Sequence, residues 1–64
     1  MVTINGKEVQ AEGRALSDYL RDAGYDVKRV AVERNGEIVP KASFGETILQ
    51  SGDVVEIVGF VGGG

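Results

Sequence analysis

Val54-Val55-Glu56-Ile57-Val58 is the segment of this chain with the strongest strand preference, because four of its five residues are β-branched. Successive residues of a strand point to opposite faces of a sheet, so Val55 and Ile57 share one face. Glu56 lies on the other face together with Val58, and a charged side chain in mid-strand belongs in solvent. We therefore expect Val55 and Ile57 to enter the core of a sheet that is covered on one side only.

Two Asn-Gly pairs each join two short runs with strand character: Asn5-Gly6 and Asn35-Gly36. Asn-Gly is the strongest two-residue hairpin signal, because both central residues of a type I′ turn have positive φ. Pro40 follows the second hairpin, and a residue without an N–H group marks the edge or the end of a strand. The four predicted strands span residues 1–5, 7–11, 30–34 and 37–39.

Between the two hairpins the spacing of apolar residues becomes helical. Four of them fall at positions i, i+3, i+4 and i+7, which line one face of a helix over residues 15–23. Gly24 follows where a left-handed glycine commonly ends a helix, and so short a helix must pack against the sheet to be stable. A further helical turn is expected at Ser43, because Glu46 follows it in a capping pattern. The four apolar residues are Leu16, Tyr19, Leu20 and Ala23.

The predicted order of elements is hairpin, helix, hairpin, irregular segment and last strand. A single helix must then cover one face of a sheet that holds all the strands. Because the helix joins the two hairpins, we expect the last strand in the middle of the sheet. This is an α+β arrangement, the β-grasp, with a mixed sheet of four to five strands and one main helix, and we expect it to span residues 1–61. The expected core neighbours of Val55 and Ile57 are Leu16, Leu20, Val2 or Ile4, Val30 or Val32, and Leu49.

The composition of the chain argues against several classes of function. Its 64 residues carry a net charge of −3, which disfavours nucleic acid as a partner, and they are too few for most folds with a deep catalytic cleft. It has no Cys and no His, so disulfides, thiol chemistry and the usual proton shuttle at neutral pH are absent. No apolar run approaches the roughly 18 residues that cross a bilayer, and no signal peptide follows Met1. We therefore expect a soluble, cytoplasmic, monomeric module that needs neither a membrane nor nucleic acid.

Gly62-Gly63-Gly64 is the most informative feature for function. These glycines serve no predicted turn, but a flexible glycine tail can thread a channel that any β-carbon would block. The group that the tail presents is the α-carboxylate of Gly64, which ATP can activate to an acyl-adenylate for attack by a sulfur or nitrogen nucleophile. The alternatives are a frayed end or a linker remnant, although linkers usually mix glycine with serine. Val58 and Phe60, on the solvent-facing side of the last strand, are candidate contacts for a partner.

Three segments of the chain resemble the ThiS family, the ubiquitin-like sulfur carriers of thiamine biosynthesis. They are Ile4–Lys7, Ala31–Pro40 and Gly52–Gly64, and the resemblance extends over essentially the whole chain. The second segment carries the pattern Ala-Val-x-x-Asn-Gly-x-Ile-Val-Pro, and the third ends in Phe-Val-Gly-Gly-Gly. Gly59 departs from the family pattern, in which a larger residue is expected, and a glycine there favours a loosened strand or a bulge.

This resemblance implies a carrier on which other enzymes act. An E1-like, ThiF-like adenylyltransferase would adenylate the Gly64 carboxylate, and sulfur from a cysteine desulfurase relay would replace AMP to leave a thiocarboxylate. The carrier would then donate the sulfur at a ThiG-like thiazole synthase. Gly62 and Gly63 would lead into the active site, and Val58 and Phe60 would make docking contacts. ATP and Mg²⁺ would belong to the activating enzyme, and this chain itself would bind no cofactor or metal.

Other interpretations remain open from the sequence alone. The small subunit of molybdopterin synthase shares the fold and the terminal thiocarboxylate, but its chain is usually longer. A ubiquitin-like modifier would join Gly64 to a lysine, and an inert interaction domain would not use the tail. An enzyme is the least supported alternative, because Asp18 and Asp22, one helical turn apart, are typical of surface charge.

Overall fold

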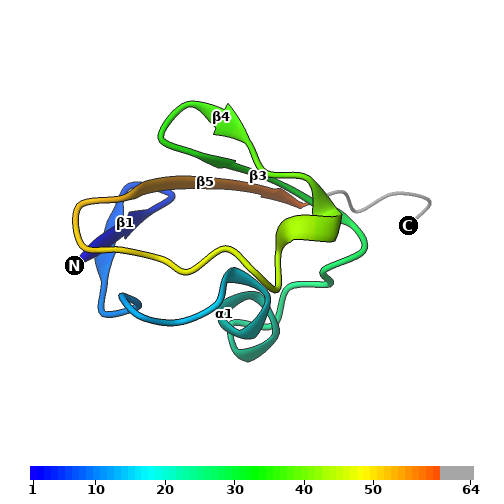
Figure 1. Cartoon of the computed structure of the whole chain (residues 1–64), viewed down its shortest axis with the longest axis horizontal. Coiled ribbons are helices and arrows are strands. Elements are labelled where there is room, and N and C mark those ends of the chain that lie inside the picture. The colour runs from blue at the N-terminus through cyan, green and yellow to red at the C-terminus, as the bar shows by residue number, and fades with distance from the viewer. Residues whose placement is uncertain (60–64) are drawn as a thin grey trace.

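The computed structural model describes residues 1–59 and shows one α-helix packed against one face of a five-stranded sheet (Figure 1). The strand order is β2-β1-β5-β3-β4, so the last strand lies in the middle, as expected. The sheet is mixed, because β5 runs parallel to β1 and antiparallel to β3. This confirms the β-grasp prediction. The elements are β1 (Val2–Ile4), β2 (Lys7–Val9), α1 (Leu16–Asp22), β3 (Val30–Arg34), β4 (Glu37–Ile38), the 3₁₀ turn η1 (Lys41–Ser43) and β5 (Val54–Gly59).

Both hairpins close through the predicted two-residue turns. Asn5 and Gly6 have φ of 51° and 83°, and Asn35 and Gly36 have φ of 53° and 85°. Positive φ at both central positions defines the type I′ turn. The return strand β2 ends at Val9 rather than at residue 11, because the chain turns inward there and buries Ala11.

The two turn asparagines also hold β5 from either side. The Asn5 side chain accepts a hydrogen bond from the Ile57 N–H at 2.7 Å and donates one to the Ile57 carbonyl at 3.2 Å. The Asn35 side chain accepts from the Val54 N–H at 2.9 Å and donates to the Asp53 carboxylate at 3.1 Å. The residues that permit the turns thus join both hairpins to the central strand.

The helix α1 ends at the predicted glycine. The N–H of Gly24 donates to the Arg21 carbonyl at 3.1 Å, and the N–H of Tyr25 donates to the Leu20 carbonyl at 2.9 Å. Gly24 has a φ of 89°, so these two bonds form a Schellman motif. The side chains of Leu16 and Leu20 are fully buried against the sheet and Tyr19 is half-buried, as predicted. Ala23 was wrongly placed on this face: it is exposed, because α1 ends at Asp22 and Ala23 is its C-cap.

The core contains every residue that the sequence predicted and two that it missed. Where the sequence left a choice, both residues of each pair are buried, because positions i and i+2 of a strand share a face: Val2 with Ile4, and Val30 with Val32. The missed residues are Ala11 and Phe44, with 1% and 4% of their surface exposed. Both lie in irregular segments, where no periodicity marks a buried position.

Two local expectations were wrong. Ser43 does not cap a helical turn: η1 starts after Pro40, whose φ of −62° is compatible with a helix start, and Ser43 is the last residue of η1. Gly59 forms no bulge against β3, because it pairs with Val30 in the same one-to-one register as the preceding residues. Among residues 1–59, the helix falls short of the length and apolar character that a membrane crossing requires.

Candidate functional site

The strand β5 ends at Gly59, five residues before Gly64, whose carboxylate is the predicted reactive group. β5 is the central strand, and its last residue, Gly59, pairs with Val30 of β3. Phe60 and the glycines Gly62, Gly63 and Gly64 lie outside the described residues. The candidate site therefore consists of the surfaces that surround the end of β5.

The solvent-facing side of β5 carries the predicted partner contact Val58. Its side chain is 57% exposed and lies opposite Ala31 of β3, while Val55 and Ile57 on the other face are buried. The alternation predicted from the sequence is confirmed for this strand. Val58 is thus available to a partner, and it lies one residue before Gly59.

Glu56 and Glu33 lie directly opposite each other on the same exposed face. Exposed apolar side chains surround this pair: Ile38 is 67% exposed and lies next to Glu33, and Val54 is 47% exposed. Like charges in register on neighbouring strands are destabilising. This face therefore combines exposed apolar surface with negative charge. The combination favours a role in binding a partner over a role in stabilising the fold.

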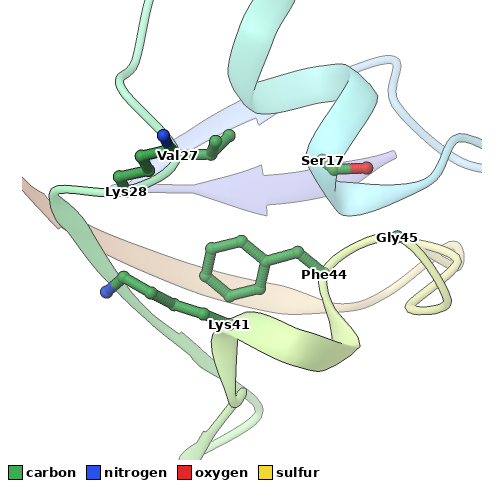
Figure 2. A pocket seen from close by; sticks show the side chains of 6 residues that line it. All are labelled: Ser17, Val27, Lys28, Lys41, Phe44 and Gly45. Atoms are coloured by element: carbon green, nitrogen blue, oxygen red, sulfur yellow. The ribbon is translucent and has the colours of Figure 1, made fainter.

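A pocket of about 280 Å³ opens on the helix side of the sheet (Figure 2). Its walls come from the first turn of α1, from the segment before β3 and from η1 with the two residues after it. The Lys41 ammonium donates a hydrogen bond to the carbonyl of Val30 at 2.8 Å, and Val30 is the residue that pairs with Gly59. The pocket therefore adjoins the end of β5. Its lining residues are Ser17, Val27, Lys28, Lys41, Phe44 and Gly45.

This pocket has no signature in the sequence. Its lining residues are spread from position 17 to position 45, and none of them belongs to a recognisable motif. The burial of Phe44 brings η1 toward α1, and that contact is a property of the tertiary structure. No local pattern could have brought Lys28 and Lys41 to one surface.

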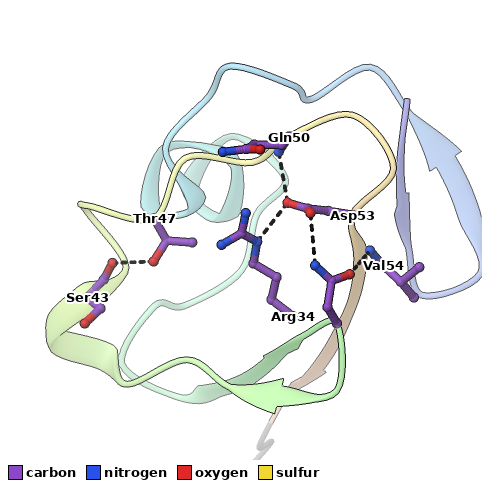
Figure 3. Close-up of polar contacts among 7 residues, drawn as sticks. Arg34, Ser43, Thr47, Gln50, Asp53 and Val54 are labelled. Atoms are coloured by element: carbon purple, nitrogen blue, oxygen red, sulfur yellow. Dashed lines mark hydrogen bonds and ion pairs between the residues drawn. The ribbon is translucent and has the colours of Figure 1, made fainter.

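The start of β5 is held by a buried carboxylate (Figure 3). Asp53 accepts hydrogen bonds from the Arg34 guanidinium at 2.8 Å, from the Gln50 N–H at 2.9 Å and from the Asn35 amide at 3.1 Å. Burial raises the pKa of Asp53, but the three donors together outweigh it, so the pKa lies below its ordinary value of 3.8. This network explains why an acid is buried at this position: it fixes β5 to β3.

The other carboxylates of the described chain do not form a reactive centre. Asp18 and Asp22 pair with Arg21 and Arg14 on the exposed side of α1, as expected for surface charge. Within residues 1–59, no three side chains of the types that ligate metals lie close enough together to hold a metal ion.

A family model described as the ThiS family matches residues 1–64. The chain belongs to the ThiS family. Among its relatives, the sulfur carrier protein ThiS of Bacillus subtilis is 42% identical over 66 residues, and that of Thermus thermophilus is 38% identical over 64 residues, each alignment covering both chains completely. The crystal structure of a thiamine biosynthesis protein, ThiS, from Geobacter metallireducens superposes with a TM-score of 0.75 at 33% identity, covering 98% of this chain and 97% of that one.

The ThiS-family chain also resembles one part of a longer protein. It is 44% identical over 64 residues to a thiazole synthase of Paramagnetospirillum magneticum, in an alignment that covers 98% of this chain. The chain spans 20% of the length of that thiazole synthase. The family assignment confirms the resemblance that the three sequence segments indicated, and it favours the thiamine carrier over the molybdopterin alternative.

Proposed function

We propose that Gly64 is the working group of this sulfur carrier of thiamine biosynthesis. Its α-carboxylate attacks the α-phosphorus of ATP in an activating enzyme, and pyrophosphate leaves. Sulfide then attacks the acyl carbon of the adenylate, AMP leaves with the bonding electron pair, a proton is released, and Gly64 carries a thiocarboxylate. ATP and Mg²⁺ act in the enzyme, and this chain binds neither.

The observation that carries this proposal is the match to ThiS carriers along their entire length. The alignments with the carriers from Bacillus subtilis and Thermus thermophilus cover both chains completely, so they include the glycine-rich end of this chain. The described residues also supply no Cys or His that could carry sulfur on a side chain. A main-chain carboxylate that a separate enzyme activates requires neither Cys nor His in this chain.

We propose thiazole synthase as the acceptor of the sulfur. The relatives named thiazole synthase contain a segment similar to this chain within one polypeptide. Two proteins that work on one another gain from such a link, since it raises their effective concentration. In this chain the two parts would meet by docking, with Val58 and Phe60 as contacts and Gly62 and Gly63 leading Gly64 into the active site.

The test is a mass measurement on the intact chain. The protein is incubated with an E1-like adenylyltransferase from the same organism, with ATP and with sulfide. We expect a gain equal to the exchange of one oxygen for sulfur, located by fragmentation at Gly64. The matched control carries one additional alanine after Gly64, which leaves residues 1–59 unchanged. If the mass stays unchanged although the same activating enzyme forms AMP when it is given other carriers, the proposal is refuted.

A further inference from the structure

The basic residues of this chain divide into two groups. All four arginines form ion pairs with aspartates of the described chain. None of the three lysines has a carboxylate within 4.0 Å among residues 1–59. Two of these three, Lys28 and Lys41, line the pocket beside the end of β5, whereas Lys7 lies on the edge strand β2.

The pocket combines an apolar floor with this positive charge (Figure 2). The ring of Phe44 points into the space between α1 and η1, and Val27 faces it from the segment before β3. In this view Lys28 and Lys41 lie at one end of the pocket, and Ser17 and Gly45 lie at the other. A simple anion would leave the apolar floor uncovered, and an apolar side chain alone would supply no counter-charge to the two lysines, neither of which has a carboxylate within 4.0 Å among residues 1–59.

The position of the pocket places it near whatever protein receives Gly64. Lys41 is fixed to the Val30 carbonyl, and Val30 pairs with Gly59. Five residues follow Gly59, and an extended chain advances at most about 3.6 Å per residue, so the distance from the end of β5 to Gly64 has an upper limit of roughly 18 Å. An enzyme that takes so short a segment into its active site must contact the surface around the end of β5.

We propose that this pocket binds a segment of thiazole synthase in which an apolar side chain adjoins an aspartate or glutamate. The proposal rests on the proposed function, since it identifies the surface by which the carrier docks. The apolar side chain covers Phe44 and Val27, and the carboxylate pairs with Lys28 and Lys41. Because the chain carries a net charge of −3, an acidic partner segment is repelled by much of its surface, and this pocket is lined by two lysines that form no ion pair with the described part of the chain.

The first experiment reverses one charge in the pocket and one elsewhere. Lys28→Glu and Lys7→Glu each change the net charge from −3 to −5, because +1 becomes −1 in both. No hydrogen bond of the Lys28 side chain is present in the described chain, so thermal unfolding of this variant should match that of the parent. We expect Lys28→Glu to weaken binding to thiazole synthase about tenfold at low salt, and Lys7→Glu less than about twofold. Calorimetry or interferometry measures both.

A second variant tests the pocket without changing charge. A Cβ added at Gly45 would meet Ser17 Oγ at 3.8 Å, an ordinary contact, and Gly45 does not have positive φ. Gly45→Leu should therefore fill the pocket while the fold persists. We expect it to weaken binding to thiazole synthase as Lys28→Glu does.

Three results would overturn the proposal. The first is an equal affinity of Lys28→Glu and Lys7→Glu for thiazole synthase, and the second is an unchanged affinity of Gly45→Leu. The third is tighter binding of thiazole synthase by Lys28→Glu, which would indicate that the pocket holds the chain's own C-terminal carboxylate. The mass measurement separates this failure from failure of the proposed function. A parent chain that gains sulfur but does not bind thiazole synthase, or binds it no better than Lys28→Glu, refutes the docking proposal alone.

Discussion

Four aspartates form ion pairs with arginines in the described chain. Of these, Asp53 should cause the largest loss of stability when it is replaced with asparagine. The Asp53 carboxylate accepts three hydrogen bonds, one of them from the Arg34 guanidinium at 2.8 Å. Asparagine retains one acceptor oxygen but turns an NH₂ group toward a donor. A hydrogen bond to a charged group contributes about 1.5–3 kcal/mol, and water can reach Arg34, whose side chain is 29% exposed. We therefore expect a loss of about 2 kcal/mol in the free energy of unfolding.

Thermal unfolding followed by circular dichroism measures this loss. For a domain of this size, 2 kcal/mol corresponds to a decrease in Tm of roughly 8–16 °C. The matched control is Asp18→Asn, which removes the same charge from an exposed pair with Arg21 on α1. Exposed pairs contribute little, so its Tm should change by no more than a few degrees. Equal Tm values for Asp53→Asn and the parent at neutral pH would refute the reasoning.

The Asp53 carboxylate also gives the difference in Tm between the parent and Asp53→Asn a defined pH dependence. The pKa of Asp53 is lower in the folded chain than its ordinary value of 3.8, so the unfolded state takes up the proton first as the pH falls. The stabilisation is therefore complete above the unfolded value, declines below it and is lost once the pH has passed through the folded value. The gap in Tm between the parent and Asp53→Asn should narrow steadily as the pH falls from about 5 through the ordinary value of 3.8 and below it. A gap that stays constant over this interval would show that the charge of Asp53 is not its cause.

Three further changes test the fold and the docking face. Leu20→Ala removes a fully buried side chain and should cost about 2–5 kcal/mol in urea unfolding, and a variant of parental stability would contradict the packing of α1. Glu56→Lys places an opposite charge beside Glu33 and should raise the free energy of unfolding by about 0.2–1 kcal/mol, whereas a loss of stability would show that the two carboxylates do not repel one another. Phe60→Ala should weaken binding to the partner by about 2 kcal/mol or more while Tm stays constant, and unchanged affinity would remove Phe60 from the docking surface.

The parts of this fold that the sequence predicted correctly are those with a local physical cause. Asn35-Gly36 predicted a turn because few other residue pairs adopt positive φ twice in succession, and the structure has that turn. Gly24 predicted the end of the helix for the same reason. The alternation around Val55 and Ile57 predicted which face of β5 is buried, because a strand repeats every two residues.

The parts that were missed have causes far away in the chain. Phe44 is buried although no periodicity surrounds it, and its burial creates the pocket beside the end of β5. Asn5 reads as a turn residue, yet its side chain also binds Ile57, which lies 52 positions away. Asp53 reads as part of a loop, yet it is the one buried charged residue of the described chain.

By itself, then, the sequence determined the main helix and the strands, their order, the burial of Leu16 and Leu20 on α1 and of Val55 and Ile57 on β5, and the family to which the chain belongs. These follow from side-chain periodicity and from backbone conformations that only certain residues adopt. The tertiary structure alone decided which polar groups meet across β5 and that Lys28 and Lys41 share one pocket. Such contacts join residues that are distant in the sequence: β5 lies between the two hairpins, so Asn5 meets Ile57, and the packing of η1 beside α1 brings Lys41 to the pocket that Lys28 also lines.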